Sequence, residues 1–228
     1  MTTHRPHMDR DLEILAQTPL PTEHGRFRCL AFRHRSEPQT THLALVLGEV
    51  QGASELTVRV HSECFTGEVL GSLKCDCRGQ LNAALARIAE RGRGVLVYLR
   101  QEGRGIGLVA KLKAYALQEE EGLDTVDANR RLGLPDDLRR YEAAAALLDH
   151  LGVDSVVLLT NNPAKVTGLT QAGTAVARRE PLVTPRSPQA RRYLETKAAR
   201  MGHILEPVST GETAGGAVEG EAVDDDAA

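Results

Sequence analysis

The sequence predicts a layered α/β/α fold, in which a mixed, largely parallel sheet carries helices on both faces. Short apolar runs typical of buried strands alternate along the chain with segments of helical periodicity. The 228 residues contain no internal repeat and no Pro-rich or Ser-rich linker. A chain of this length fits a single hydrophobic core. We therefore expect one main domain.

Four segments have the pattern of strands. Residues 43–47 place leucine at every second position, and residues 56–61 alternate in the same way. Residues 94–99 (GVLVYL) and 155–159 (SVVLL) are short and almost wholly apolar. Such runs are typical of strands that are covered on both faces.

The 3.6-residue period predicts helices over residues 80–91, 108–121, 144–151, 162–173 and 187–201. In the first, the apolar spacing runs to Ile88 and stops at a glycine. In the second, Leu108, Leu112 and Tyr115 mark the face that we expect to turn inward. The fourth starts with Asn162-Pro163, a capping residue followed by proline at the first helical position.

The two ends of the chain differ from its body. Residues 1–18 are expected to be a loose lead-in. Residues 206–228 contain seven acidic side chains, no Lys or Arg and little to bury, which is the composition of a disordered acidic tail. Since the whole chain carries −3, residues 1–205 carry +4. That charge suits a small polyanion, although it also fits a protein with no charged partner.

Composition excludes several classes of protein. The apolar share of 41% and the charged share of 26% are ordinary for a globular chain, so collagenous and fully disordered proteins are excluded. No apolar run approaches the ~18 residues of a membrane span, and no apolar stretch follows the charged N-terminus. With aromatics at 3% and no Lys/Arg stripe, nucleic acid is not an expected partner. We expect a cytoplasmic protein without a membrane partner.

Three of the four cysteines have the spacing C-x10-C-x-C, formed by Cys64, Cys75 and Cys77. Three thiolates fit zinc, and one open coordination position leaves room for water, as in a catalytic zinc site. Cys29 lies far upstream and has the surroundings of a buried apolar residue. Two alternatives remain open: buried thiols without a metal, or a structural site that Cys29 closes.

His61-Ser62-Glu63 directly precedes the first cysteine. This H-x-E triplet resembles that of the zinc nucleobase deaminases, whose glutamate moves protons beside metal-bound water. The second half of their motif, P-C-x-x-C, is missing here. Glu63 is a candidate base or substrate anchor, with a solvated charge at a strand end as the alternative.

Residues 100–107 (RQEGRGIG) follow an expected strand and open an expected helix. Backbone amides at a helix start bind anions, and Arg104 can contact a phosphate. The spacing matches neither a Walker A loop nor a dinucleotide fingerprint, in which Asp124 would be the ribose acid. A tight turn without a ligand is the alternative.

Two further segments are candidate ligand loops. Residues 127–141 crowd acids and arginines between two expected helices, as a solvated surface or an active-site loop would. Thr160 and Lys165 follow an expected strand, where α/β folds place ligand-binding groups.

Taken together, these segments resemble the GTP cyclohydrolase II family over roughly residues 20–205. The motifs are RVHSEC, SLKCDC, RQEGRGIGL, AYALQ, DTVDANRRLG, DLRRY, LLTNNPAK and TKAARMGH. The resemblance implies a catalytic domain over 19–205, the stand-alone form of the enzyme and a homodimer. It implies hydrolysis of GTP to formate, pyrophosphate and 2,5-diamino-6-ribosylamino-4(3H)-pyrimidinone 5′-phosphate, the first step of riboflavin biosynthesis. One zinc per chain is implied, with magnesium on the triphosphate.

The resemblance also assigns roles to residues. Cys64, Cys75 and Cys77 match the zinc ligands. Asp137 matches a general base, Arg139 a nucleophile at the α-phosphate, and Tyr115 a tyrosine that assists opening of the imidazole ring. The positions that match contacts to GTP are Arg59, Val60, His61, Ser62, Glu63, Gln80, Glu102, Gly103, Arg104, Thr125, Thr160 and Lys165.

The chain departs from the family pattern in a few places. Asp127 stands where the family commonly has Glu, and an extra acid occurs within residues 119–121. Arg140 and the acidic tail are further peculiarities of this chain. We expect these differences to affect local loop geometry. Two other functions stay open: a zinc deaminase, which would need His61 as a metal ligand, and a zinc-stabilised nucleic-acid module, whose binding would depend steeply on salt.

Overall fold

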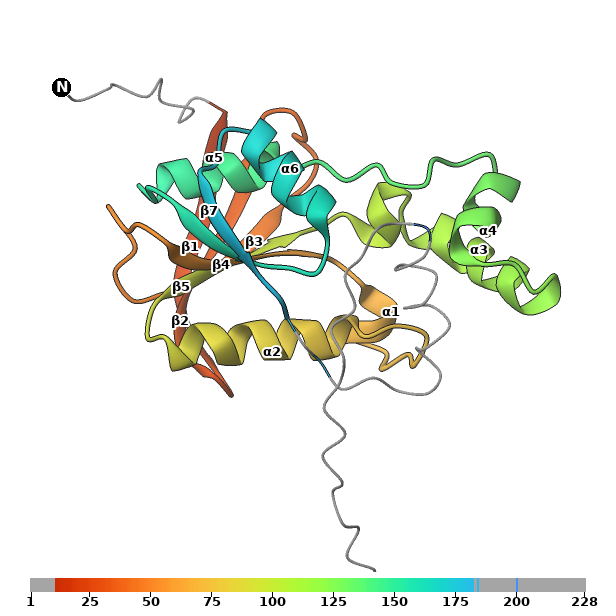
Figure 1. Ribbon diagram of the computed structural model, residues 1–228, viewed down its shortest axis with the longest axis horizontal. Helices are drawn as coiled ribbons and strands as arrows, with labels where there is room; N and C mark the ends of the chain where they lie inside the picture. Colours follow the sequence, from red (N-terminus) through yellow and green to blue (C-terminus); the bar gives the residue numbers. More distant parts are fainter. Residues whose placement is uncertain (1–10, 183, 185–199, 201–228) are drawn as a thin grey trace, which may run out of the picture.

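The centre of the computed structural model, which describes residues 11–182, 184 and 200, is a seven-stranded sheet (Figure 1). Its strands lie in the order β1-β2-β3-β5-β4-β6-β7. Their bounds are β1 (Leu12–Thr22), β2 (Gly25–His34), β3 (His42–Leu47), β4 (Leu56–Ser62), β5 (Gly94–Leu99), β6 (Val156–Leu159) and β7 (Val176–Glu180).

The pairing changes direction within the sheet. β1, β2, β3 and β5 pair antiparallel in turn, whereas β5, β4, β6 and β7 pair parallel. Five of the seven strands therefore point the same way, and β1 and β3 point the opposite way. The α/β class with a mixed, largely parallel sheet is confirmed.

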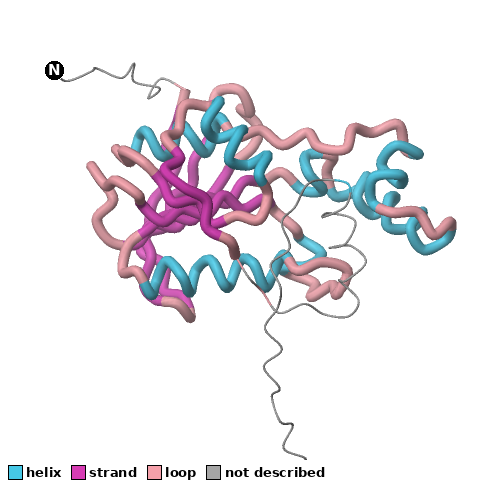
Figure 2. The backbone as a smooth tube through the Cα atoms, viewed as in Figure 1, coloured by secondary structure: helices cyan, strands magenta, loops and turns pink. Residues whose placement is uncertain are grey.

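Helices cover both faces of the sheet, as Figure 2 shows. α2 lies on one face, α5 and α6 lie on the other, and α3 and α4 project to the side (Figure 1). The bounds are α1 (Phe65–Glu68), α2 (Cys77–Glu90), the 3-10 turn η2 (Glu102–Gly105), α3 (Leu108–Glu120), α4 (Thr125–Arg131), α5 (Glu142–His150) and α6 (Pro163–Gln171). Among the described residues, no helix has the length and apolar character needed to cross a membrane.

Alternation along the central strands divides the core in two. Val95 and Val97 of β5 face one apolar cluster together with Leu147 of α5. Leu96 faces the other cluster together with Ile88 of α2. Because successive strand residues point to opposite faces, a wholly apolar strand supplies both layers.

Two strands at the antiparallel end were not expected from the sequence. Residues 12–18 belong to β1 and not to a loose lead-in. β1 is the edge strand and most of its residues are exposed, so its sequence has no alternating apolar pattern. β2 pairs with it along the whole length of both strands. The expected tail and nearly all of the expected helix over 187–201 lie outside the described residues.

The expected inward face of α3 is wrong. Leu108 and Leu112 are exposed, at 36% and 48%, while Lys111 and Ala114 are buried. α3 lies beside α4 at the side of the molecule and does not cover the sheet (Figure 1). Its buried face lines a polar cavity, so apolar periodicity identifies the wrong side.

We predict that Ile88→Ala lowers the free energy of unfolding by about 2–5 kcal/mol, because it leaves a cavity under α2. Leu112→Ala, the matched control, should change it by less than about 0.5 kcal/mol because the side chain is exposed. Urea denaturation of both variants measures the difference. An equal loss of free energy of unfolding in both variants would show that Leu112 is buried, as the apolar spacing in the sequence of α3 suggests.

Candidate functional site

The functional groups gather at the carboxyl ends of β4, β5 and β6. From β4 the chain passes through α2 to β5, which pairs with β4 on one side. It then passes through α5 to β6, which pairs with β4 on the other side. α2 and α5 lie on opposite faces (Figure 1). Open α/β sheets bind ligands where the order of strands reverses in this way.

A cavity of about 950 Å³, including its open mouth, occupies this position. Its walls come from β4, the segment after β5, α3, α4 and the segment after β6. They include Arg59, His61, Ser62, Glu63, Cys64, Cys77, Gln80, Glu102, Gly103, Arg104, Ile106, Lys111, Ala114, Tyr115, Gln118, Thr125, Asn129, Arg139, Thr160, Asn161, Asn162 and Lys165.

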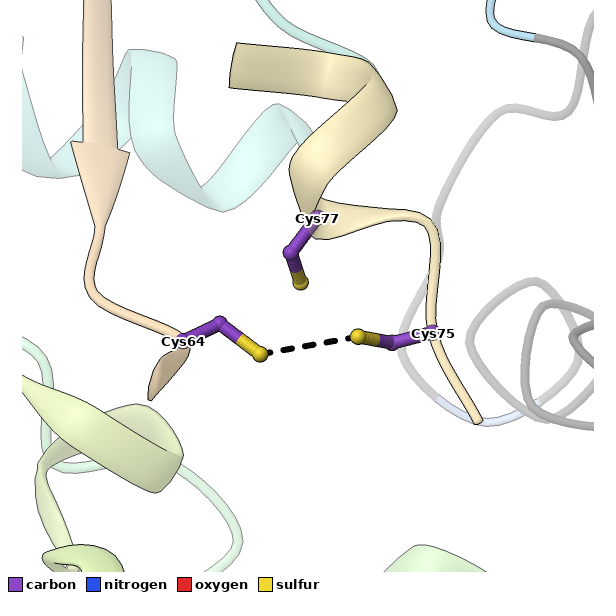
Figure 3. A group of neighbouring side chains, drawn as sticks. All are labelled: Cys64, Cys75 and Cys77. Atoms are coloured by element: carbon purple, nitrogen blue, oxygen red, sulfur yellow. Dashed lines mark hydrogen bonds between the residues drawn. The ribbon is translucent and has the colours of Figure 1, made fainter. Parts of the chain in front are cut away.

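Three cysteine sulfurs converge (Figure 3), and two of these residues, Cys64 and Cys77, line the cavity. Cys64 follows β4, Cys77 is the first residue of α2, and Cys75 lies two residues earlier. Their ligand atoms lie within 4.8 Å of one another, and the sulfurs of Cys64 and Cys75 are 3.5 Å apart. Soft thiol ligands from two segments fit zinc.

Cys29 takes no part in this cluster. It lies in β2, is half-exposed and belongs to no metal-binding group among the described residues. The four-cysteine alternative is therefore wrong for this arrangement, and so is the expectation that Cys29 is fully buried.

Lys111 ties the cysteines to the glycine-rich turn. Its ammonium donates to the Cys64 sulfur at 3.1 Å and to Glu102 Oε1 at 2.8 Å. Burial opposes a charge on Lys111, but these two contacts raise the pKa of its ammonium above the ordinary value. Hydrogen bonds from Cys75 and Cys77, with this ammonium nearby, hold the pKa of the Cys64 thiol far below its usual range. The same hydrogen bond between Cys64 and Cys75 raises the pKa of the Cys75 thiol, so Cys64 is the cysteine favoured to carry the thiolate.

His61 belongs to a buried network beside the cysteines. Its Nε2 lies 2.6 Å from Glu68 Oε1, and the Tyr98 hydroxyl donates to Glu68 Oε2 at 2.6 Å. Burial lowers the pKa of His61 to about 4, so the ring is neutral at pH 7. The deaminase alternative needed His61 as a metal ligand, and among the described residues it is not part of the cysteine group.

Arg59 is buried at the floor of the cavity. It donates to the Leu159 carbonyl at 2.8 Å and to Gln80 Oε1 at 2.7 Å. Burial lowers the pKa of Arg59 to about 10, so the guanidinium still carries its charge at neutral pH. Gln80 in turn donates to Asp76 at 2.6 Å, which fixes the start of α2.

The glycine-rich turn is bent so that Arg104 enters the cavity. Gly103, Arg104 and Gly105 have φ values of 60°, 62° and 90°, a left-handed conformation that costs energy at the arginine. The Arg104 carbonyl accepts from the Leu138 amide at 2.9 Å. Both terminal nitrogens of the Arg104 guanidinium are buried and have no hydrogen-bond partner among the described residues.

Asp137 and Arg139 contact each other. Asp137 accepts from Arg139 Nε at 2.9 Å and also from Nη2. Burial would raise the pKa of Asp137, but this guanidinium holds it below the ordinary value. Arg139 lines the cavity, and Asp137 lies behind it as its partner.

The end of β6 supplies another cation. Lys165 is buried at the cavity wall, and its ammonium donates to the Val60 carbonyl at 2.8 Å. Thr160 Oγ1 accepts from the Asn162 amide at 3.0 Å, and Asn162 caps α6. The capping geometry expected from the Asn-Pro pair thus holds Lys165 in the first turn of the helix.

The structure brings together nearly all of the residues singled out in the sequence. Three of these residues do not line the cavity: Val60, Cys75 and Asp137. The Val60 carbonyl accepts from Lys165, and the Cys75 sulfur contacts that of Cys64. Asp124 caps α4 by accepting from two amides and also contacts Arg200, so the dinucleotide role is not supported. Asp127 contacts the same arginine.

Sequence reasoning missed polar residues on two helices. Lys111, Gln118 and Asn129 line the cavity. Gln118 and Asn129 stand in the motifs AYALQ and DTVDANRRLG, but the sequence analysis assigned no role to either residue. The available signal was spacing, since Gln118 lies one turn after Tyr115 and Asn129 lies one turn after Thr125.

We predict that Gly67→Ala weakens zinc binding at least about tenfold without removing a ligand. A Cβ at this position would lie 2.7 Å from the Cys75 sulfur and 3.3 Å from the Cys64 sulfur, so the thiols must move apart. Gly79→Ala is the control, because its Cβ meets Thr184 at an ordinary 3.7 Å. Zinc titration against a chromogenic chelator measures both. Unchanged affinity in Gly67→Ala would show that the ion binds elsewhere.

Comparison with known proteins identifies the family. A family model described as GTP cyclohydrolase II matches residues 13–181. GTP cyclohydrolase-2 from Cronobacter sakazakii is 52% identical over 194 residues, covering 85% of this chain and 98% of that protein. The riboflavin biosynthesis protein RibBA is 52% identical in Salinispora arenicola, over 90% of this chain, and 50% identical in Bacillus mycoides, over 89%. The chain spans about half the length of these RibBA relatives, 49% in both. With the family model matching most of its length, the chain belongs to the GTP cyclohydrolase II family.

Proposed function

We propose that this chain hydrolyses GTP and opens its imidazole ring, releasing formate and pyrophosphate. The product would be 2,5-diamino-6-ribosylamino-4(3H)-pyrimidinone 5′-phosphate, the first intermediate of riboflavin biosynthesis. The observation that carries the proposal is Arg104, whose buried terminal guanidinium nitrogens have no hydrogen-bond partner within the described residues. They open on the same cavity as the cysteine cluster. A buried cation without a partner is costly unless an anionic ligand completes it.

The triphosphate is proposed to lie against the cationic wall of the cavity. Arg104 lies in the turn after β5, and Arg139 lies in the segment before α5. The hydrogen bond from the Leu138 amide to the Arg104 carbonyl connects these two segments. Lys165 enters from the end of β6. Guanidinium groups bind phosphate oxygens with paired hydrogen bonds. Magnesium is proposed to neutralise the pyrophosphate that leaves.

The imidazole end of the purine is proposed to lie near the cysteines. Zinc bound by Cys64, Cys75 and Cys77, one per chain, would supply activated water at neutral pH. Glu63 lines the cavity next to Cys64 and is the nearby carboxylate proposed to take a proton. Its ion pair with Arg100, at 3.3 Å, holds that carboxylate in position.

Asp137 and Arg139 are proposed to act at the α-phosphate. Asp137 contacts two nitrogens of Arg139, so it is the group placed to remove a guanidinium proton. The same contact lowers the pKa of Asp137 and opposes that transfer. The contact with Asp137 therefore first orients the Arg139 guanidinium toward the phosphate, and any proton transfer from Arg139 to Asp137 follows.

Tyr115 is proposed to assist opening of the imidazole ring. It lines the cavity, and the Lys111 and Lys74 ammonium groups lie 5.6 Å and 5.3 Å from its ring centre. Its hydroxyl is the group on this side chain that can transfer a proton. Its position on the cavity wall argues against a role in core packing. The homodimer implied by the family resemblance and the cytoplasmic location expected from the sequence composition both stay predictions.

The direct test incubates the purified protein with GTP, zinc and magnesium. We expect formate and pyrophosphate in equal amounts and no ammonia. Tyr115→Phe, which deletes only the hydroxyl, should bind GTP but release little formate, and Cys75→Ser should lose both zinc and turnover. Release of ammonia would favour the deaminase, and no product of any kind would reject the proposed reaction.

A second test addresses the phosphate end. We predict that Arg104→Ala weakens GTP binding about tenfold to a hundredfold, the size of a charge-assisted contact, and leaves guanosine binding nearly unchanged. Arg78→Ala on the exposed side of α2 serves as the charge-matched control. Calorimetric titration with both ligands gives the comparison. Equal losses for nucleotide and nucleoside would assign Arg104 to loop structure.

A further inference from the structure

Two amide side chains face the same cavity from neighbouring helices. Gln118 lies in α3, Asn129 lies in α4, and the two helices pack against each other. Gln118 Nε2 and Asn129 Oδ1 are buried and have no hydrogen-bond partner among the described residues. Asn129 is only 2% exposed. Buried amide groups are normally paired, so this donor and this acceptor point to a missing ligand.

The two amides lie on the faces that carry other site residues. Gln118 follows Tyr115 by three positions, and Asn129 follows Thr125 by four, so each pair shares a helix face. Ala114, one turn before Gln118 on α3, and Ile106 also line the cavity and supply apolar surface. A flat base needs this combination of apolar walls and a few polar groups.

The position of Gln118 along α3 gives its distance from the cysteine end of the helix. Lys111 contacts the Cys64 sulfur, and Gln118 lies seven residues further along the same helix. At 1.5 Å per residue this separates them by about 10 Å along the helix axis. A purine whose imidazole ring lies near the cysteines therefore directs its six-membered ring toward the two amides.

We infer that Gln118 and Asn129 recognise the six-membered ring of the purine and select guanine, an inference that rests on the proposed function. Asn129 Oδ1 accepts from the N1–H and 2-amino groups of the base. Gln118 Nε2 donates to the 6-oxo oxygen. Adenine presents a donor at position 6 and no amino group at position 2, so both contacts fail.

The test compares nucleotides that differ in the hydrogen-bonding groups of the base. Inosine triphosphate lacks the 2-amino group of GTP, and 2,6-diaminopurine riboside triphosphate carries an amino group at position 6 and no hydrogen on N1. Formate release gives kcat/KM for each nucleotide, and calorimetric titration gives its binding. Asn129→Leu should reduce kcat/KM for GTP at least about tenfold and that for inosine triphosphate much less. The preference for GTP over inosine triphosphate then disappears. Asn129→Asp, which keeps the acceptor oxygen, should retain it.

Gln118→Leu gives a second arm at a half-buried position. It should reduce the preference for GTP over the 2,6-diaminopurine nucleotide, the remainder coming from the Asn129 contact to N1–H, while keeping the preference over inosine triphosphate. Asn82→Leu on the exposed face of α2 is the matched control and should change neither ratio. Equal losses for all nucleotides in both the Asn129 and Gln118 variants would show that the amides only support the helices, and would overturn the inference.

The binding measurements separate this inference from the proposed function. If the wild-type protein binds GTP but releases no formate, the proposed reaction fails while the amide variants still test base selection. If the wild-type protein turns over GTP and both variants keep wild-type selectivity, the reaction stands and the amides have no part in choosing the base.

Discussion

A buried ammonium joins the three segments from which the site is built. Lys111 Nζ, on α3, contacts the Cys64 sulfur after β4 and the Glu102 carboxylate after β5. Glu102 also accepts from the Phe65 amide at 2.7 Å, which orients the start of α1. Removing one member of such a buried group leaves an uncompensated charge, at a cost of about 3–5 kcal/mol. Lys111 thus positions the cysteines and the glycine-rich turn together.

Around this centre the protein leaves several buried polar groups incomplete. The Arg104 guanidinium, the Gln118 and Asn129 amides and the Ser62 hydroxyl all line the cavity with buried atoms that lack a partner within the described residues. Each such atom lowers stability relative to a satisfied one. Their grouping on one cavity supports the proposal that a ligand with phosphate and hydrogen-bonding base edges completes them. These groups lower the free energy of unfolding, but they are already in place to bind a ligand.

The sheet explains why residues so distant in sequence meet. β4 pairs in parallel with β5 on one side and β6 on the other, so three carboxyl ends lie together. Arg59 and His61 share one face of β4, while Val58 and Val60 face the core under α5. The same alternation that builds two apolar layers therefore also aims a cation and an imidazole at the cavity.

The sequence by itself determined the features that depend on local chemistry. The strands β5 and β6, the apolar face of α2 and the Asn162-Pro163 cap were predicted correctly, because each reflects contacts within a few residues or burial against one core. The C-x10-C-x-C spacing likewise predicted that three cysteines lie together. Tertiary structure decided the rest. The edge strand β1 has no alternating apolar pattern because most of its residues are exposed to solvent. On α3, Lys111 is buried and Leu112 is exposed because the buried face of this helix lines the cavity that holds the charged site residues. Apolar periodicity reports burial against other apolar groups, so it cannot show where a helix buries charge against a ligand site.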